Sequence, residues 1–233
     1  MLTLDGRLSV CASLVRKGAH LADVGTDHAY LPVWLAKNGL ITSAVACDVR
    51  EKPLRSGQEN IEYYKVGDIV TTRLSDGLDE VKPEEADDVV IAGMGGELIA
   101  DIISRAPWLK SAEKRLILQP MTKPELLRRL LCENGYSIES ETPCAHGGKF
   151  YTVLLVSYTG EAFTPTPSFR YAGKLQNDGE CARGCMNSVL SKLLKKRNGT
   201  ALGGGDTSEF DEAINYITQT FGVDGRENEG EKQ

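Results

Sequence analysis

The most constraining feature of this chain is an alternation of apolar runs of strand length with segments of helical periodicity. Seven aliphatic-rich runs predict β-strands, at 20–24, 44–48, 69–74, 88–92, 115–119, 136–141 and 150–158. Apolar residues at three- and four-residue spacing predict helices at 4–15, 30–38, 53–64, 97–108 and 123–134. Alternating strands and helices are typical of an α/β fold with a largely parallel sheet.

The last two predicted strands differ from the first five in how they can pair. The loop at 142–149 between them has no room for a crossover helix, so they must pair antiparallel, at an edge of the sheet. The first five runs are short and nearly all apolar, as in parallel strands covered by helices on both faces. These features predict the Rossmann-like class I methyltransferase architecture, with a seven-stranded, mainly parallel sheet and an antiparallel edge hairpin. A fold by itself supports a function only weakly.

The 233 residues divide into two unequal parts and a tail. The Thr-Pro-Thr-Pro run at 164–167 predicts a linker between a Rossmann-like domain at 1–160 and a helical extension at 168–222, with few contacts crossing it. In the extension we predict helices at 171–197 and 208–221, separated by a glycine-rich break at 198–207, which suggests a helical hairpin or short coiled coil. The polar tail at 223–233 is predicted to be disordered.

Composition excludes several classes of protein. With 41% hydrophobic and 26% charged residues, and no apolar run near the roughly 18 residues that span a bilayer, we expect a cytoplasmic protein without a membrane segment. The six cysteines form no CxxC pair and the three histidines lack zinc-site spacing, so we expect free thiols and no metal. The net charge of -6 argues against general nucleic-acid binding, although a local basic patch is sufficient for RNA.

A glycine turn follows the first predicted strand, in the segment Leu-Ala-Asp-Val-Gly-Thr-Asp-His-Ala-Tyr-Leu-Pro at 21–32. Such a turn presents backbone N–H groups to a ligand. Dinucleotide sites carry a second glycine where this chain has Asp27. A carboxylate repels a pyrophosphate, whereas S-adenosylmethionine has no phosphate and presents an ammonium, a carboxylate and a sulfonium. The turn therefore favours S-adenosylmethionine over NAD, unless Asp27 only caps the following helix.

Aspartates follow three successive predicted strands. Asp23 lies in the glycine turn, and Asp48 ends the second strand, where doubly wound folds place the acid that binds ribose hydroxyls. Asp76 follows the third strand, where methyltransferases commonly hold the adenine amino group. Taken alone, Asp48 or Asp76 is explained equally well as an ordinary turn residue. Together the three predict a nucleoside cofactor.

The fourth strand runs into Ile-Ala-Gly-Met-Gly-Gly-Glu at 91–97. Three glycines at the carboxyl end of a strand permit a close backbone approach to a ligand, or merely ease helix packing. Enzymes that methylate exocyclic amines usually carry an Asn/Asp-Pro-Pro-aromatic motif here, and this chain does not. The absence favours a ring nitrogen as the methyl acceptor.

Four segments, at 23–32, 91–96, 115–120 and 147–151, together resemble the bacterial tRNA (adenine(22)-N1)-methyltransferase family. The resemblance covers about residues 4–158, whereas the glycine-rich insert and short second helix depart from that family's coiled-coil extension. It implies S-adenosylmethionine as cofactor and tRNA as substrate. The expected cofactor contacts, with immediate neighbours, are Asp23, Gly25, Thr26, Asp48, Val49, Asp76, Gly77, Ala92, Gly93 and Met94. The expected catalytic and substrate-side residues are Asp27, His28, Tyr30, Gln119 and Pro120.

Methylation of adenine N1 leaves a cation, which a nearby carboxylate or carbonyl would stabilise. Asp27 is the first candidate, and the carbonyls of 93–96 are the second. Tyr30 either stacks on a flipped base or simply packs. Phosphate contacts are expected at Lys149, Lys192, Lys195, Lys196 and Arg197, although the last four also fit a solvated helix end.

The sequence thus predicts methyl transfer from S-adenosylmethionine to N1 of an adenine in tRNA, adenine 22 by resemblance. Two alternatives remain at this stage: a class I methyltransferase for another RNA or a small molecule, and an RNA-binding module without turnover. The intact acids at 23, 48 and 76 argue against the second alternative. The oligomeric state is left open.

Overall fold

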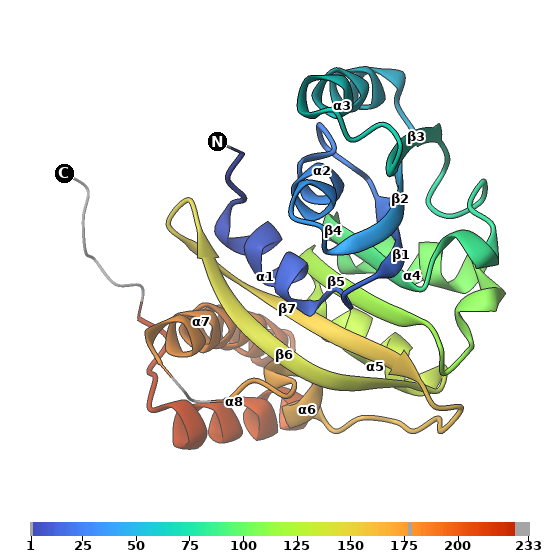
Figure 1. The fold of residues 1–233 in the computed structure, drawn as a ribbon. Coiled ribbons are helices and arrows are strands. Elements are labelled where there is room, and N and C mark those ends of the chain that lie inside the picture. The colour runs from blue at the N-terminus through green and yellow to red at the C-terminus, as the bar shows by residue number, and fades with distance from the viewer. Residues whose placement is uncertain (1, 177–178, 227–233) are drawn as a thin grey trace.

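The computed structural model describes residues 2–176 and 179–226 and arranges seven strands in one sheet (Figure 1). The strands are β1 (Ala19–Val24), β2 (Ile41–Asp48), β3 (Val70–Leu74), β4 (Asp88–Gly95), β5 (Arg115–Thr122), β6 (Tyr136–His146) and β7 (Lys149–Tyr158). Their order is β3-β2-β1-β4-β5-β7-β6. The first five pair in parallel, and β7 is antiparallel to both β5 and β6. The predicted parallel sheet with an antiparallel edge hairpin is confirmed.

Helices cover both faces of the sheet because neighbouring strand residues point to opposite sides. One face is covered by α1 (Gly6–Leu14), α2 (Tyr30–Lys37) and α3 (Glu51–Tyr64), which share a core with Leu21 of β1. The other face is covered by α4 (Gly96–Arg105) and α5 (Pro124–Glu133), which share a core with Ala22. Short 3-10 turns at Pro83–Glu85 and Pro107–Leu109 complete the connections.

Three strands run beyond their predicted carboxyl ends, and the difference shapes the site. β4 continues through Gly95 and β5 through Thr122, because Gly95 pairs with Thr122 across the two strands. β6 continues to His146, so the connection to β7 is the two-residue turn Gly147-Gly148 with φ of +56° and +70°. A two-residue turn with positive φ matches the twist of paired strands. The predicted loop at 142–149 is therefore mostly hairpin.

The helical extension consists of α6 (Pro167–Ala172), α7 (Glu180–Leu202) and α8 (Ser208–Phe221). Instead of one helix at 171–197 there are two, and α7 continues past Gly199 to Leu202, within the predicted break at 198–207, since one interior glycine costs a helix only about 1 kcal/mol. Val223 packs on the core of the extension, and the Gly225 N–H donates to Asn187 Oδ1 at 2.9 Å. The start of the predicted disordered tail is thus ordered, and 227–233 lie outside the described residues.

A buried ion pair joins the extension to the sheet. Arg128 of α5 and Glu141 of β6 are 1% and 0% exposed and are bonded at 2.9 and 2.7 Å. Arg128 Nη1 also donates to the carbonyl oxygens of Arg170 and Tyr171, at 2.8 and 3.2 Å. Gly173, at φ +65°, passes so close that a Cβ there would collide with the Glu141 carboxylate. Contrary to the expectation that few contacts cross the linker, this cluster, the 128/141/173 clasp, anchors α6.

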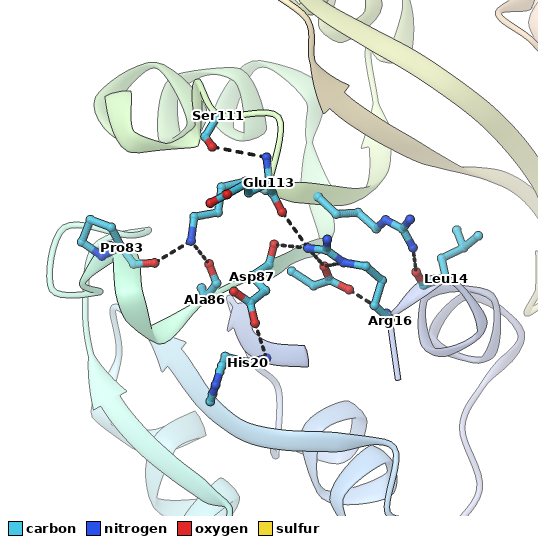
Figure 2. Close-up of polar contacts among 11 residues, drawn as sticks. Leu14, Arg16, His20, Pro83, Ala86, Asp87, Ser111 and Glu113 are labelled. Atoms are coloured by element: carbon cyan, nitrogen blue, oxygen red, sulfur yellow. Dashed lines mark hydrogen bonds and ion pairs between the residues drawn. The ribbon is translucent and has the colours of Figure 1, made fainter. Parts of the chain in front are cut away.

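The amino edge of the parallel strands is closed by polar contacts (Figure 2). Arg16 Nη2 donates to the carbonyls of Asp87 and Glu113, both at 2.9 Å, and the His20 N–H donates to Asp87 Oδ2 at 3.0 Å. Arg16 also pairs with the buried Asp88. These groups satisfy one another, which leaves the opposite, carboxyl edge as the place for a site. In the described part of the chain, no helix is long and apolar enough to cross a bilayer.

Candidate functional site

The carboxyl ends of the parallel strands bring the predicted site residues together. Asp23 of β1 pairs with Ala46 of β2 and Val90 of β4, and Ala92 of β4 pairs with Gln119 of β5. The segments that follow these strands therefore share one edge of the sheet, where open α/β sheets bind ligands. We refer to this edge as the carboxyl edge.

The glycine turn after β1 folds over the end of β2. Gly25 adopts φ +73°, and the N–H groups of Gly25 and Thr26 both donate to the Cys47 carbonyl at 2.8 Å. A Cβ at Gly25 would displace the end of the Met94 side chain, and the positive φ itself favours glycine at this position. Thr26 is buried, and its Oγ1 lies near the Asp23 carboxyl group without forming a hydrogen bond of normal geometry to any described residue. A buried hydroxyl without a partner is a group that a bound ligand can satisfy.

Asp23 and Asp48 are both 6% exposed, but their surroundings differ. Burial raises the pKa of Asp23 to about 6, and the nearby Thr26 hydroxyl opposes that rise only in part. Asp48 Oδ1 accepts the Arg50 N–H at 2.8 Å and Arg50 Nε at 3.3 Å, while no described residue bonds to Oδ2. The neighbouring Val49 is exposed. Asp23 therefore lacks a cationic partner, and Asp48 has one oxygen available for a hydroxyl group.

Asp76 is the most exposed of the three predicted acids, with 66% of its side chain accessible. Its Oδ1 accepts Arg105 Nη2 at 3.0 Å, and the same guanidinium pairs with Asp79 and Asp101. Gly77 has φ +61°, and a Cβ there would lie 2.9 Å from Ile102. The loop after β3 is thus held against α4, with Asp76 at the surface.

Gln119 connects the ends of β4 and β5 underneath the site. It is fully buried; its Oε1 accepts the Gly93 N–H, and its Nε2 donates to the Pro120 carbonyl, both at 3.1 Å. Pro120 is buried. Gly93 has φ +80°, and a Cβ added there would have no heavy atom within 4 Å, so the space beside it is open. The amide of Gln119 is therefore engaged by backbone, which suits positioning of the β4 backbone at Gly93 better than direct contact with a substrate.

The turn before α2 holds two non-glycine residues with left-handed backbone, His28 at φ +61° and Ala29 at φ +53°. Such conformations cost of order 1–3 kcal/mol each and persist where the surroundings hold them. Asn60 Nδ2 of α3 donates to the His28 carbonyl at 2.9 Å. The rings of His28 and Tyr30 are stacked, with centroids 5.3 Å apart, and Asp27, 79% exposed, lies 3.5 Å from His28 Nε2. An aromatic pair and a carboxylate thus project from one turn.

The predicted phosphate contacts are divided by the structure. Lys149 is exposed at the hairpin turn, and Lys192 and Lys195 are exposed on α7. In contrast, Lys196 pairs with Glu125 at 3.1 Å and Arg197 with Asp211 at 2.9 Å. These last two are thus partly neutralised within the protein.

Sequence reasoning did not select three residues near the turn: Asn60, Lys52 and Arg55, all on α3. Two basic residues in the helix that follows Asp48 were a visible signal for the last two. Asn60 had none, because its contact with His28 depends on how α3 packs. We also find a separate cavity of about 370 Å³ between α4 and α5, near the unpartnered Tyr136 hydroxyl. No predicted site residue lines it, and the acids and strained turns gather at the carboxyl edge instead.

Comparison with known proteins agrees with this arrangement. Residues 4–154 match the family described as "Methyltransferase domain". Over 154 residues the chain is 36% identical to the tRNA (adenine(22)-N(1))-methyltransferase of Bacillus subtilis (strain 168), a match that covers 66% of this chain and 65% of that relative's length.

Two solved structures resemble the chain over nearly its whole length. A candidate tRNA (m1A22) methyltransferase of Streptococcus pneumoniae, in complex with S-adenosyl-L-methionine, has a TM-score of 0.79 and 31% identity, and the match covers 92% of this chain and 98% of that one. M. capricolum TrmK, in complex with S-adenosyl-homocysteine, has a TM-score of 0.76 and 25% identity, with 94% and 98% covered. The similarity therefore extends through the helical extension.

Proposed function

Because the chain belongs to the tRNA (adenine(22)-N1)-methyltransferase family, we propose that it transfers a methyl group from S-adenosylmethionine to N1 of an adenine in tRNA. The observation that carries the proposal is the set of acids and glycine turns on one edge of the sheet. Asp23 and Asp48 lie at the carboxyl ends of β1 and β2, and Asp76 follows β3, with the register shift at Gly93 of β4 on the same edge. Adenine 22 is the position that the family name implies.

The side chains at the carboxyl edge fit the cofactor. Asp23, buried without a cation, suits the ammonium group, and the free oxygen of Asp48 suits the ribose hydroxyls. Asp76 and Gly77 would border the adenine ring, and the unpartnered Thr26 hydroxyl offers a further hydrogen bond near the glycine turn. When bound, S-adenosylmethionine supplies a methyl carbon activated by its sulfonium sulfur.

The protein's main task in this reaction is to position the acceptor. Adenine N1 carries a lone pair and no proton, so no general base is required. The rate gain must come from holding the nucleophile in line with the methyl group. A base inside folded RNA has to leave its stack to be reached, and aromatic side chains commonly receive it. The exposed Tyr30 ring, stacked on His28, suits that role.

The methylated ring carries a positive charge, which nearby acceptors stabilise. Asp27 is exposed next to the His28 ring and is our first candidate for this role. The backbone carbonyls of the Gly93–Gly96 turn are the second. Gln119 serves as a positioning residue, because it fixes the Gly93 N–H and the Pro120 carbonyl.

The acceptor atom is tested by product analysis. The protein is incubated with bulk bacterial tRNA and isotopically labelled cofactor, and the RNA is digested to nucleosides under conditions that exclude alkaline rearrangement. We expect 1-methyladenosine as the primary product, and its loss in a Tyr30→Ala variant that still binds cofactor. N6-methyladenosine or a methylated guanine as the primary product would show that the proposed acceptor is wrong.

A further inference from the structure

Exposed cations lie on both sides of the carboxyl edge, on elements far apart in the chain. Lys52 and Arg55 belong to the first turns of α3, and Lys149 begins β7. All three are exposed, and their side chains form no hydrogen bond or ion pair with another described residue. Most other arginines of the chain, such as Arg73 and Arg105, are paired with acids. Unpaired cations are the ones available to an external anion.

The two cations of α3 belong to the helix that packs on the turn with the aromatic pair. A Cβ at Gly57 would lie 3.2 Å from the Ala29 Cβ, so the middle of α3 packs directly on that turn. Asn60, one turn further, bonds to the His28 carbonyl. Residues three apart on a helix share a face, so Lys52 and Arg55 stand together at the start of α3, which follows the end of β2 at the carboxyl edge.

Lys149 reaches the other side because the hairpin is longer than the strand it borders. The pairing of β5 with β7 ends at Leu118 and Leu154, while β6 and β7 stay paired to His146 and Lys149. At a rise of about 3.3 Å per residue, the turn extends roughly 16 Å past the last β5 pair. In the sheet order, β1, β4 and β5 lie between β2, from which α3 continues, and this hairpin.

Between the two basic flanks, the edge carries acids and, in the described part of the chain, no unpaired cation that we have identified. Asp23 and Asp27 lie at the end of β1, Asp48 ends β2 next to the α3 flank, and a phosphate placed beside them would be repelled. An uncharged base suffers no such repulsion. This charge pattern separates the two parts of a nucleotide: the base is admitted to the centre, and its backbone is directed to the flanks.

We propose that Lys52 and Arg55 on one side and Lys149 on the other contact the backbone phosphates of an RNA strand that lies across the carboxyl edge, with one base turned inward. This inference rests on the proposed function and specifies how its substrate is held. It assigns phosphate contacts to the catalytic domain itself, in addition to any that the extension makes.

The salt dependence of binding tests the proposal. The affinity for bulk bacterial tRNA is measured for wild type and for Lys52→Gln/Arg55→Gln/Lys149→Gln. The KCl concentration is varied from about 50 to 200 mM, a range over which affinity through phosphate contacts falls steeply. Each single-strand phosphate contact contributes about 0.7 to the slope of log affinity against log salt, so the triple variant should bind more weakly, with a slope shallower by about 2. Its affinity for S-adenosylmethionine, measured by calorimetry, should match wild type.

A matched control removes the same charge from the opposite edge. Lys17, Lys65 and Lys110 are exposed and lie in the segments that lead into the amino ends of β1, β3 and β5. Changing all three to Gln should leave the tRNA slope unchanged. Equal salt slopes in wild type and the carboxyl-edge variant, or equal losses of tRNA affinity in both variants, would overturn the proposed phosphate contacts. If wild type still methylates tRNA, the proposed function is unaffected by that result. A wild-type protein that methylates no tRNA overturns the proposed function, and this surface with it.

Discussion

Three aspartates in equivalent positions at strand ends lie in three different environments. Asp23 is buried without a charged partner, Asp48 is buried but bonded to a backbone N–H, and Asp76 is largely exposed beside Arg105. In the proposed function, these surroundings suit one residue type to three parts of the cofactor. Their spacing after strands made the acids recognisable in the sequence, whereas their partners come from other elements and were not.

Replacing Asp48 with Ala should weaken S-adenosylmethionine binding by about 1–3 kcal/mol, because hydroxyl groups lose a charged acceptor. The fold should survive, since Asp48 forms no contact across the core. Calorimetric titration measures the affinity, and Asp68→Ala, at an exposed acid away from this edge, is the control. Unchanged affinity in a folded Asp48 variant would remove this residue from the site.

Cofactor affinity should rise as the pH increases from about 5 to 6.8. Burial raises the pKa of Asp23 from 3.8 to about 6, so the free protein holds a proton on this carboxyl at pH 5. An ammonium group beside the carboxylate would favour its ionised form and bring the pKa down again. Linkage then gives an affinity roughly tenfold lower at pH 5 than near neutrality. Calorimetry at several pH values measures the effect.

The same raised pKa makes the cofactor-free protein less stable as the pH rises, whereas cofactor affinity increases. The folded state disfavours ionised Asp23, and this lowers the free energy of unfolding. The loss is absent below pH 3.8, grows between pH 3.8 and 6, and is complete above that range, at about 3 kcal/mol. Asp23→Asn should therefore remove the pH dependence of cofactor binding and stabilise the cofactor-free protein at pH 7. A variant that keeps the wild-type pH profile would assign the titration to another group.

At the scale of elements, the positions of the predicted strands and of most helices agree with the structure, and their ends do not. Glycines at 93–96 indicated a turn, yet β4 continues through Gly95 because its backbone pairs with β5. Glycine 199 lies within α7, and the predicted helix at 171–197 is divided by Gly173 and the residues after it. Local composition marks where an element can end, and pairing with distant segments decides where it does end.

Arg128→Ala should destabilise the protein by about 3–5 kcal/mol, because it leaves Glu141 charged and buried without its partner. The double variant Arg128→Met/Glu141→Leu should recover most of that loss, since it leaves no unpaired charge. Arg129→Ala is a matched control, because the neighbouring Arg129 pairs with Glu133 at the surface and should cost less than about 1 kcal/mol. Urea unfolding measures all three, and similar midpoints for Arg128→Ala and Arg129→Ala would contradict the role given to the clasp.

At the scale of the whole molecule, the overall charge was a poor guide. A net charge of -6 argued against RNA, but the acids gather at the centre of the carboxyl edge and unpaired cations flank it. The alternation of strands and helices predicted the architecture, since burial dictates that pattern. The distribution of charge over a surface depends on the fold and had no signature in the composition.

Deleting residues 160–233 should leave a folded, cofactor-binding core that is less stable than the full chain and binds tRNA more weakly. The loss of stability follows from the Arg170 and Tyr171 carbonyls, which Arg128 would lose as partners. Thermal unfolding and tRNA affinity are compared between the full chain and the deletion. The same deletion in the Arg128→Met/Glu141→Leu background should cost less stability than it does in wild type. Equal tRNA affinity at both lengths would deny the extension a docking role, and an insoluble deletion would place the domain boundary elsewhere.

The 128/141/173 clasp also restricts how such a chain can diverge over generations. Replacing Arg128 or Glu141 alone leaves a buried charge without its partner. Replacing Gly173 alone places a Cβ where it collides with the Glu141 carboxylate. The three positions can therefore change only through joint replacement, whereas the far end of α7 and the loop before α8 are free to accept insertions. We therefore expect the residues that attach the extension to vary little among related proteins, and the far end of α7 and the loop before α8 to vary in length and sequence.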